Sequence, residues 1–257
     1  MKDKLLYLDH NAAIHVLKRR RPDFATAIEE FRGRGGKIVY SPAHIEEIAN
    51  IYRTKATDAD CDIYVHNHLR FFANLTDCWE FLPSVSGPII LKREHPSVCL
   101  KRVIDLYELT FFAEGNENAL RDSHPPSRSP PPSIDVFEDP EVLRIFKFEL
   151  AVRGFEISEI PYGPKIRESY AIASKLVDIG FRSIRCAGFG REKKSETRSS
   201  IHDTTHAGFG IMANVFVSGD NRLLAMVKAC YKMLKADCLP MSPEEFVSEI
   251  KRQPGQK

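Results

Sequence analysis

Four acidic side chains occupy positions where α/β proteins often bind a metal ion or a reacting group. Two of them follow short apolar runs that are typical of buried strands, and two stand near the start of predicted helices that come after such a run or a loop. In an open parallel sheet, ligands bind beyond the carboxyl ends of the strands, so these side chains are expected to meet at one edge. The four residues are Asp9, Glu47, Asp203 and Asp220.

A cluster of carboxylate oxygens favours a small, hard divalent cation. Mg²⁺ and Mn²⁺ take few protein carboxylates, keep several of their waters and bind phosphate oxygens. Such ions lower the pKa of a bound water and neutralise the charge that develops on a phosphate during in-line attack. The four acids therefore predict a site for a divalent ion that can also bind phosphate oxygens.

The elements that must position these acids alternate between strand and helix at both ends of the chain. Apolar runs near residues 3–9, 37–40, 214–218 and 237–240 predict neighbouring parallel strands, with the first one central because it is the most uniformly apolar. Helices are expected between them, as at Ser41-Pro42, where a serine N-cap and a proline at the first helical position indicate a helix start. The pattern predicts an α/β fold in which helices cover both faces of one parallel sheet, giving three layers.

These segments resemble the motifs of the PIN domain, a family of metal-dependent nucleases with a Rossmann-like fold. LLYLDHN is similar to the first motif of the family, and SPAHIEEI to its helix that carries a glutamate. DTTHAGFGIMANVFVSGDNRL is similar to the last two acidic motifs, and DCLPMSPEEF to the closing strand and helix. The resemblance implies that the catalytic residues and metal ligands are Asp9, Glu47, Asp203 and Asp220. It implies that the supporting residues are Asn11, Ser218 and His206.

The resemblance also implies a cofactor, a substrate and partners. The expected protein is an endoribonuclease that uses Mg²⁺ or Mn²⁺, acts on RNA more readily than on DNA, and has an antitoxin or another regulatory protein as a possible partner. Basic residues should flank the acidic site, because the acids would otherwise repel a nucleic-acid backbone. The candidates for this contact are Arg19, Arg20, Arg21, Lys193, Lys194 and Arg198. An ordinary solvated charged surface is the alternative for each cluster.

Three alternatives stay open at the level of the sequence. Glu46 competes with Glu47, because adjacent helical residues point about 100° apart, although the spacing from Ser41 favours Glu47. The segment His202-Asp203-x-x-His206 has the i, i+4 histidine spacing of zinc peptidases, with Asp in place of their usual Glu. A catalytically inactive domain that binds nucleic acid or protein is the third alternative.

The middle of the chain has no counterpart in these motifs. We expect a single domain over residues 1–257, with its core in 1–52 and 199–257 and a mostly helical insertion at 53–198. One helix of this insertion is predicted near residues 58–80. A proline- and serine-rich loop is predicted at residues 121–133, since proline cannot donate a backbone hydrogen bond.

Composition places the chain among ordinary folded proteins. It has 257 residues, 43% of them hydrophobic, and 37 Lys plus Arg against 35 Asp plus Glu, which gives a formal net charge of +2. A near-neutral chain argues against binding of polyanions over the whole surface but leaves local basic patches open. No apolar run approaches the ~18 residues of a membrane span, and a cytoplasmic protein is expected. The six cysteines include no CxxC pair and are expected to be reduced.

Overall fold

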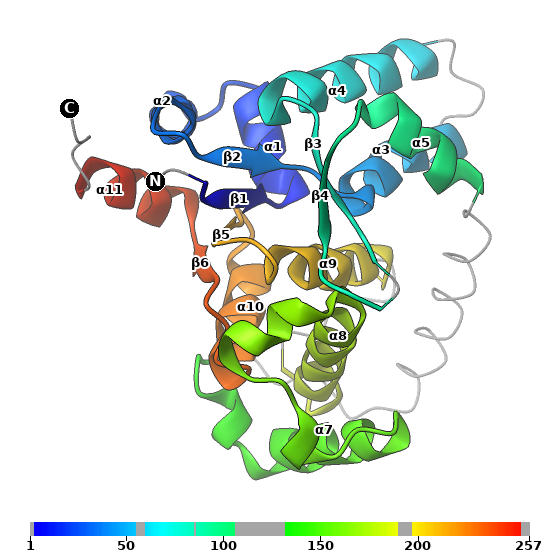
Figure 1. Cartoon of the computed structure of the whole chain (residues 1–257), viewed down its shortest axis with the longest axis vertical. Coiled ribbons are helices and arrows are strands. Elements are labelled where there is room, and N and C mark those ends of the chain that lie inside the picture. Colours follow the sequence, from blue (N-terminus) through cyan, green and yellow to red (C-terminus); the bar gives the residue numbers. More distant parts are fainter. Residues whose placement is uncertain (1–2, 55–59, 85, 106–131, 190–196, 253–257) are drawn as a thin grey trace.

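A four-stranded, all-parallel sheet forms the centre of the computed structural model, which describes residues 3–54, 60–84, 86–105, 132–189 and 197–252. Its strands, in spatial order, are β2 (Lys37–Val39), β1 (Leu5–Leu8), β5 (Val215–Val217) and β6 (Leu239–Met241) (Figure 1). All four come from the two ends of the chain, and β1 lies between two neighbours. The predicted parallel strands and the interior position of the first strand are therefore confirmed.

Successive residues of β1 point to opposite faces of the sheet, and both faces are buried. Leu6 and Leu8 pack into one hydrophobic cluster, whereas Tyr7 packs into the other. In the register, Leu6 lies beside Ile38 of β2 and Val215 of β5, so each layer continues across three strands. A strand buried on both faces needs apolar residues at every position, which explains the continuous run LLYL.

One face of the sheet is covered by helices that come from the N-terminal part of the chain and from its C-terminus. Their buried residues form the cluster with Leu6 and Leu8. These helices are α1 (His10–Leu17), α2 (Pro22–Gly33), α3 (Pro42–Thr54), α4 (Cys61–Thr76), α5 (Pro96–Asp105) and α11 (Pro243–Arg252).

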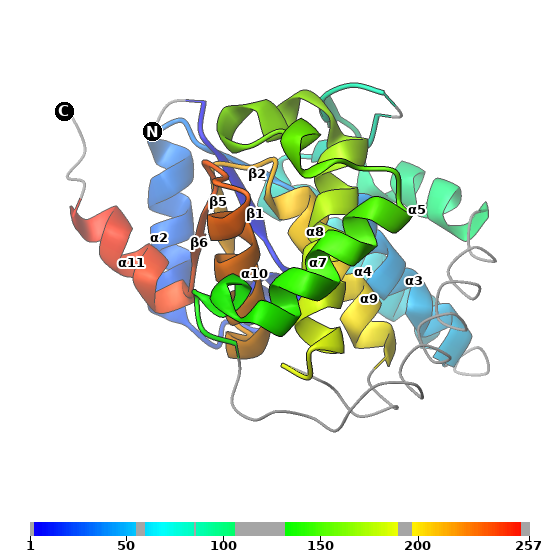
Figure 2. The same cartoon turned by 90° about the horizontal axis from the view of Figure 1, so that it is seen from below.

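The other face is covered by helices from the middle of the chain together with two that flank β5. Figure 2 shows α7, α8 and α10 on the side of the sheet away from α2. These helices are α7 (Pro140–Val152), α8 (Tyr170–Cys186), α9 (Thr197–Gly210) and α10 (Asn221–Met233). Short 3₁₀ turns precede them at η1 (Val136–Glu138), η2 (Ile157–Glu159) and η3 (Gly163–Glu168). Residues of the middle segment therefore share one core with Tyr7 and Phe216 of the sheet.

A β-hairpin after α4 corrects the helix predicted over residues 58–80. The helix ends at Thr76, and β3 (Trp79–Leu82) pairs antiparallel with β4 (Ile90–Arg93). Asp77 and Cys78 end the helix because both have positive φ values, 51° and 62°, a conformation that the sequence does not mark with glycine. The predicted loop at 121–133 lies, except for its last two residues, outside the described residues.

The start of α9 also differs from the sequence prediction. Asp203 was expected at a helix start, but α9 begins at Thr197, so Asp203 lies near the middle of the helix. The polar segment before Asp203 contains neither glycine nor proline, and nothing in it prevents an earlier start.

The cysteine prediction is confirmed, because all six thiols are free. Among the helices in the described ranges, none combines the length and the apolar character that crossing a bilayer requires.

Candidate active site

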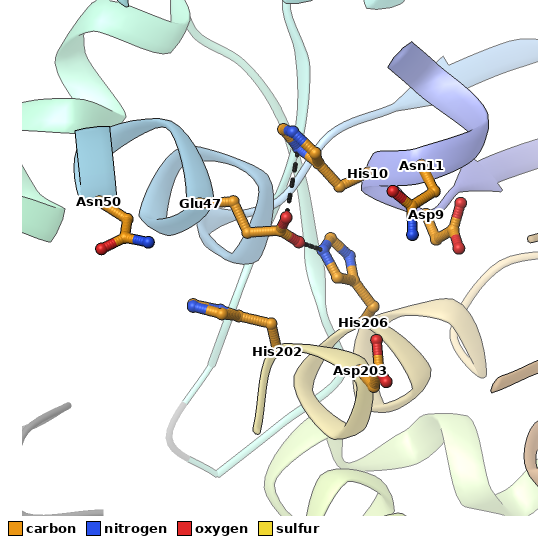
Figure 3. A pocket seen from close by; sticks show the side chains of 8 residues that line it. All are labelled: Asp9, His10, Asn11, Glu47, Asn50, His202, Asp203 and His206. Atoms are coloured by element: carbon orange, nitrogen blue, oxygen red, sulfur yellow. Dashed lines mark hydrogen bonds and ion pairs between the residues drawn. The ribbon is translucent and has the colours of Figure 1, made fainter. Parts of the chain in front are cut away.

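A pocket of about 250 Å³ opens where the carboxyl end of β1 meets α1, α3 and α9 (Figure 3). Three of the four predicted acids line it, from three separate elements. The lining residues are Asp9, His10, Asn11, Glu47, Asn50, His202, Asp203 and His206. The structure thus brings together Asp9, Glu47 and Asp203, and it places two of the predicted supporting residues, Asn11 and His206, beside them.

Asp9 is fixed at the junction of β1 and α1. It is the N-cap of α1, and its Oδ1 accepts the backbone N–H of Ala12 at 2.6 Å. Its Oδ2 accepts the hydroxyl of Ser218 at 2.6 Å, and its own N–H donates to the carbonyl of Val217 at 2.9 Å. Only 2% of Asp9 is exposed. Burial raises its pKa to about 7, against the lowering effect of the bonds from Ser218 and Ala12, and the charges of Glu47 and Asp220 raise it further.

Asp220 lies next to Asp9 through Ser218 but is not among the residues that line the pocket. Its N–H donates to Ser218 Oγ at 3.0 Å, which places Ser218 between the two acids. Its carboxylate caps α10, where Oδ1 accepts the N–H groups of Arg222 at 2.7 Å and Leu223 at 3.1 Å. Ser218 therefore bonds Asp9 and the backbone of Asp220, and the charge of Asp220 raises the pKa of Asp9.

Glu47 reaches the pocket from α3 and is held by histidines. Its Oε1 accepts from His206 Nε2 at 2.7 Å, and its Oε2 lies 3.9 Å from His10 Nδ1. Figure 3 shows Glu47 joined to both rings, with Asp9 and Asn11 beyond them at the start of α1. Glu46 does not line the pocket and lies 3.9 Å from His202 instead. The position of the pocket therefore favours Glu47 over Glu46.

The histidines around Glu47 are neutral rings rather than cations. Burial lowers the pKa of His206 to about 3 and that of His10 to about 4, and it lowers the pKa of His44 well below its usual value. A neutral ring has one donor and one acceptor nitrogen, so each can bridge two partners. These histidines therefore add no positive charge beside the carboxylates.

The donors in the pocket fit a hard divalent ion by chemical type. Carboxylate and amide oxygens of Asp9, Glu47, Asp203, Asn11 and Asn50 line one space, and hard divalent ions prefer oxygen ligands of these types. The positions of these side chains fit a single ion less well than their chemical types do. Within the described ranges, no three His, Cys, Asp or Glu side chains stand close enough together to hold one ion. Shared binding by all three acids therefore requires that at least one of the carboxylates changes its rotamer.

The basic residues expected near the site divide into two groups. Arg19 and Arg20 are exposed just beyond the end of α1, about 12 Å along this helix from Asp9. Arg21 is instead paired with Asp23 and Glu244, so its charge is already balanced. Lys193 and Lys194 lie outside the described residues, as does the side chain of Arg198.

Several pocket residues were not predicted from the sequence. His10 and Asn50 line the pocket, and Tyr7, Ser41 and His44 lie directly behind it. Signals for two of them exist in the sequence: Tyr7 is the one polar group in the run LLYL, and His44 precedes Glu47 by three residues, which places both on one side of a helix.

Comparison of the chain with protein-family models, with curated proteins and with solved structures found no match in any of the three.

Proposed function

We propose that this protein is a divalent-metal-dependent nuclease with a PIN-like, Rossmann-type arrangement, and that it hydrolyses phosphodiester bonds in RNA. One observation carries the proposal. Asp9, at the carboxyl end of an interior parallel strand, shares one pocket with Glu47 and Asp203, as the resemblance to PIN domains implies. The choice of RNA over DNA, and an antitoxin as a regulatory partner, follow from that resemblance alone.

In this proposal, Asp9, Glu47 and Asp203 hold Mg²⁺ or Mn²⁺. When bound, such an ion supplies an activated water and neutralises charge on the phosphate. Ser218 donates to Asp9 and keeps one carboxylate oxygen in place, while the second is held by the start of α1. Asp220 adds negative charge beside Asp9 and so strengthens the attraction for a cation.

The surface near the pocket offers a place for the nucleic-acid backbone. Arg19 and Arg20 place positive charge just beyond the C-terminal end of α1, whereas Asp9 lies at the N-terminal end of the same helix. Phosphate contacts of this kind bind without regard to sequence and weaken as salt is added. The proposal places the scissile phosphate at the acids and a neighbouring phosphate near these arginines.

The geometry supports the nuclease better than the zinc-peptidase alternative. Both ring nitrogens of His206 are already hydrogen-bonded, Nε2 to Glu47 and Nδ1 to the hydroxyl of Tyr7, each at 2.7 Å. A zinc ligand needs one of these nitrogens without a competing partner. The peptidase reading also leaves the buried carboxyl of Asp9 without a role.

An activity assay on purified protein tests the proposal. Labelled single-stranded RNA, structured RNA and DNA are incubated with Mg²⁺, with Mn²⁺, or with EDTA. We expect cleavage of RNA with either ion and no cleavage with EDTA. A folded Asp9→Asn variant should cleave RNA at least about 100-fold more slowly than the wild type, because the bound ion is worth several kcal/mol. Binding of RNA without cleavage under any condition would favour the inactive binding module. Zinc-dependent cleavage of peptides would favour the peptidase.

A further inference from the structure

A chain of buried hydrogen bonds runs from the pocket into the core and back to β1. His206 bonds Glu47 through Nε2 and the hydroxyl of Tyr7 through Nδ1, each at 2.7 Å. The Tyr7 hydroxyl bonds Ser41 Oγ at 2.7 Å, and the backbone N–H of Ser41 bonds His44 Nδ1 at 3.1 Å. His44 Nε2 then bonds the carbonyl of Leu8, the residue before Asp9, at 2.7 Å. The chain therefore connects the element that carries Glu47 with the end of the strand that carries Asp9.

The partners at its two ends define the direction of these bonds. The backbone N–H of Ser41 donates to His44 Nδ1 at 3.1 Å, so the other nitrogen of His44 donates to Leu8. At the pocket, an ionised carboxylate only accepts, so His206 Nε2 donates to Glu47 and Nδ1 of the neutral ring accepts from Tyr7. The oxygen of Tyr7 then accepts from Ser41. Every buried polar atom along the path from Glu47 to Ser41 has a partner in this arrangement.

The ring of Tyr7 is held by packing as well as by hydrogen bonds. It is fully buried and stacks near Phe81, Phe209 and Phe216, with ring centroids 6.3, 6.5 and 6.0 Å away. Interior side chains packed in this way have few alternative rotamers. Packing in the core therefore fixes the Tyr7 hydroxyl, and the hydrogen bond between this hydroxyl and Nδ1 in turn restrains the ring of His206.

The two oxygens of Glu47 have unequal surroundings. Oε1 accepts the short bond from His206, whereas in the described part of the chain Oε2 makes no hydrogen bond and only approaches His10 at 3.9 Å. A carboxylate can accept from one partner through one oxygen and bind a cation through the other. Hydrogen bonds to a ligating carboxylate usually tune how well it binds its metal.

We propose that Tyr7 and His206 are positioning residues for Glu47, which hold its Oε1 from behind and leave its Oε2 for a divalent cation. This inference rests on the proposed metal-dependent function and deepens it. It assigns a role to a tyrosine that the sequence motifs do not include and that touches neither the pocket nor a substrate. Removing the hydroxyl of Tyr7 should therefore weaken cation binding without removing any ligand.

Calorimetric titration of Mn²⁺ into the full chain, without nucleic acid, tests this role. The variant is Tyr7→Phe, and the matched control is Tyr231→Phe. Tyr231 is also buried and also packs against Phe216, and its hydroxyl donates to the Ala207 carbonyl of α9 at 2.6 Å without any contact to Glu47. Both changes delete one buried hydroxyl, so a general loss of packing or stability should affect them alike. Thermal unfolding of the ion-free proteins measures that shared effect.

We expect Tyr7→Phe to bind Mn²⁺ about 10- to 100-fold more weakly than the wild type, and Tyr231→Phe to bind it about equally well. If Tyr7→Phe does not fold, Ser41→Ala is used in its place, because it removes the hydrogen-bond partner of the Tyr7 hydroxyl. The expected loss of Mn²⁺ affinity is then smaller. Wild-type affinity in the folded variant, or equal losses in Tyr7→Phe and Tyr231→Phe, would overturn the positioning role and leave the proposed function intact. No binding of Mn²⁺ by the wild type would overturn both.

Discussion

Asp9 shows at the scale of one residue how burial and hydrogen bonding act in opposite directions on one carboxyl group. Its two oxygens each accept one short hydrogen bond, but they are almost completely removed from water and lie near two other carboxylates. The hydrogen bonds favour the charged form, whereas burial and the neighbouring charges oppose it more strongly, so the pKa rises. A bound cation would reverse this balance.

The raised pKa of Asp9 predicts how stability changes in an Asp9→Asn variant. Because the pKa rises from 3.8 to about 7 on folding, the proton on Asp9 contributes stability that is fully present below about 3.8. This contribution is lost as the pH rises through about 7, where the folded protein must hold a buried carboxylate. Asparagine carries no such charge. We expect the ion-free variant to need more urea for unfolding at about pH 8, and to show a smaller gain at about pH 5. A gain that is larger at the lower pH would contradict this assignment.

The buried cysteines give a second prediction at this scale. Burial raises the pKa of Cys99, Cys230 and Cys238 well above that of a free thiol. Because the thiolate is the reactive form, iodoacetamide should leave these three residues unmodified in the native protein and modify them once urea unfolds it. Peptide mapping by mass spectrometry measures both states. Rapid modification of Cys230 in the folded protein would show that its surroundings are more open than the structure indicates.

Residue types alone identified part of the site. Asp9, Glu47 and Asp203 could be predicted from the order, spacing and strand context of their motifs together, because a single carboxylate after an apolar strand or near a helix start is common. Tyr7 and His44 were missed, because their signals, a hydroxyl in a buried strand and a histidine one turn before Glu47, are shared by ordinary core residues until the partners are known. Those partners lie on other elements, with His206 far along the chain from Tyr7.

Asp220 combines two tasks at the scale of the element, since its carboxylate caps α10 and lies near Asp9. The substitutions Asp220→Ala and Asp220→Asn separate them. Alanine removes the cap and should lower the free energy of unfolding by about 0.5–2 kcal/mol, whereas asparagine keeps it at little cost. Both remove the charge. Urea unfolding measures the contribution of the cap, and the rate of RNA cleavage measures the contribution of the charge. We expect Asp220→Asn to be about as stable as the wild type but to cleave RNA more slowly. Equal activity of Asp220→Asn and the wild type would confine Asp220 to the cap.

The elements themselves could be predicted where the signal is a continuous apolar run or a proline at a helix start. The four parallel strands and α3 belong to this group. The β3–β4 hairpin was missed because its helix boundary depends on Asp77 and Cys78 in a left-handed conformation, which neither residue type indicates. The early start of α9 was missed because polar residues favour a loop and a helix about equally in the absence of glycine or proline.

At the scale of the whole molecule, the middle of the chain completes the core of the sheet. Phe181 of α8 is fully buried in the cluster that also contains Tyr7 and Phe216. Phe181→Ala should therefore destabilise the sheet as well as α8, by about 3–5 kcal/mol for a buried phenylalanine. We expect one cooperative transition, shifted to lower urea when followed by both circular dichroism and tryptophan fluorescence. Two separate transitions, with only one of them shifted, would show that the middle segment folds as an independent unit.

The rate of RNA cleavage by a matched pair of variants tests the central claim most directly. Glu46 and Glu47 are neighbours on α3, but only Glu47 lines the pocket with Asp9 and Asp203. With labelled single-stranded RNA and Mn²⁺, we predict that Glu47→Gln cleaves about 100-fold more slowly than the wild type, or slower still, because it weakens a bound ion worth several kcal/mol. Glu46→Gln should cleave at close to the wild-type rate. Cleavage by folded Glu47→Gln at the wild-type rate would contradict the claim that this pocket is a metal-dependent nuclease site.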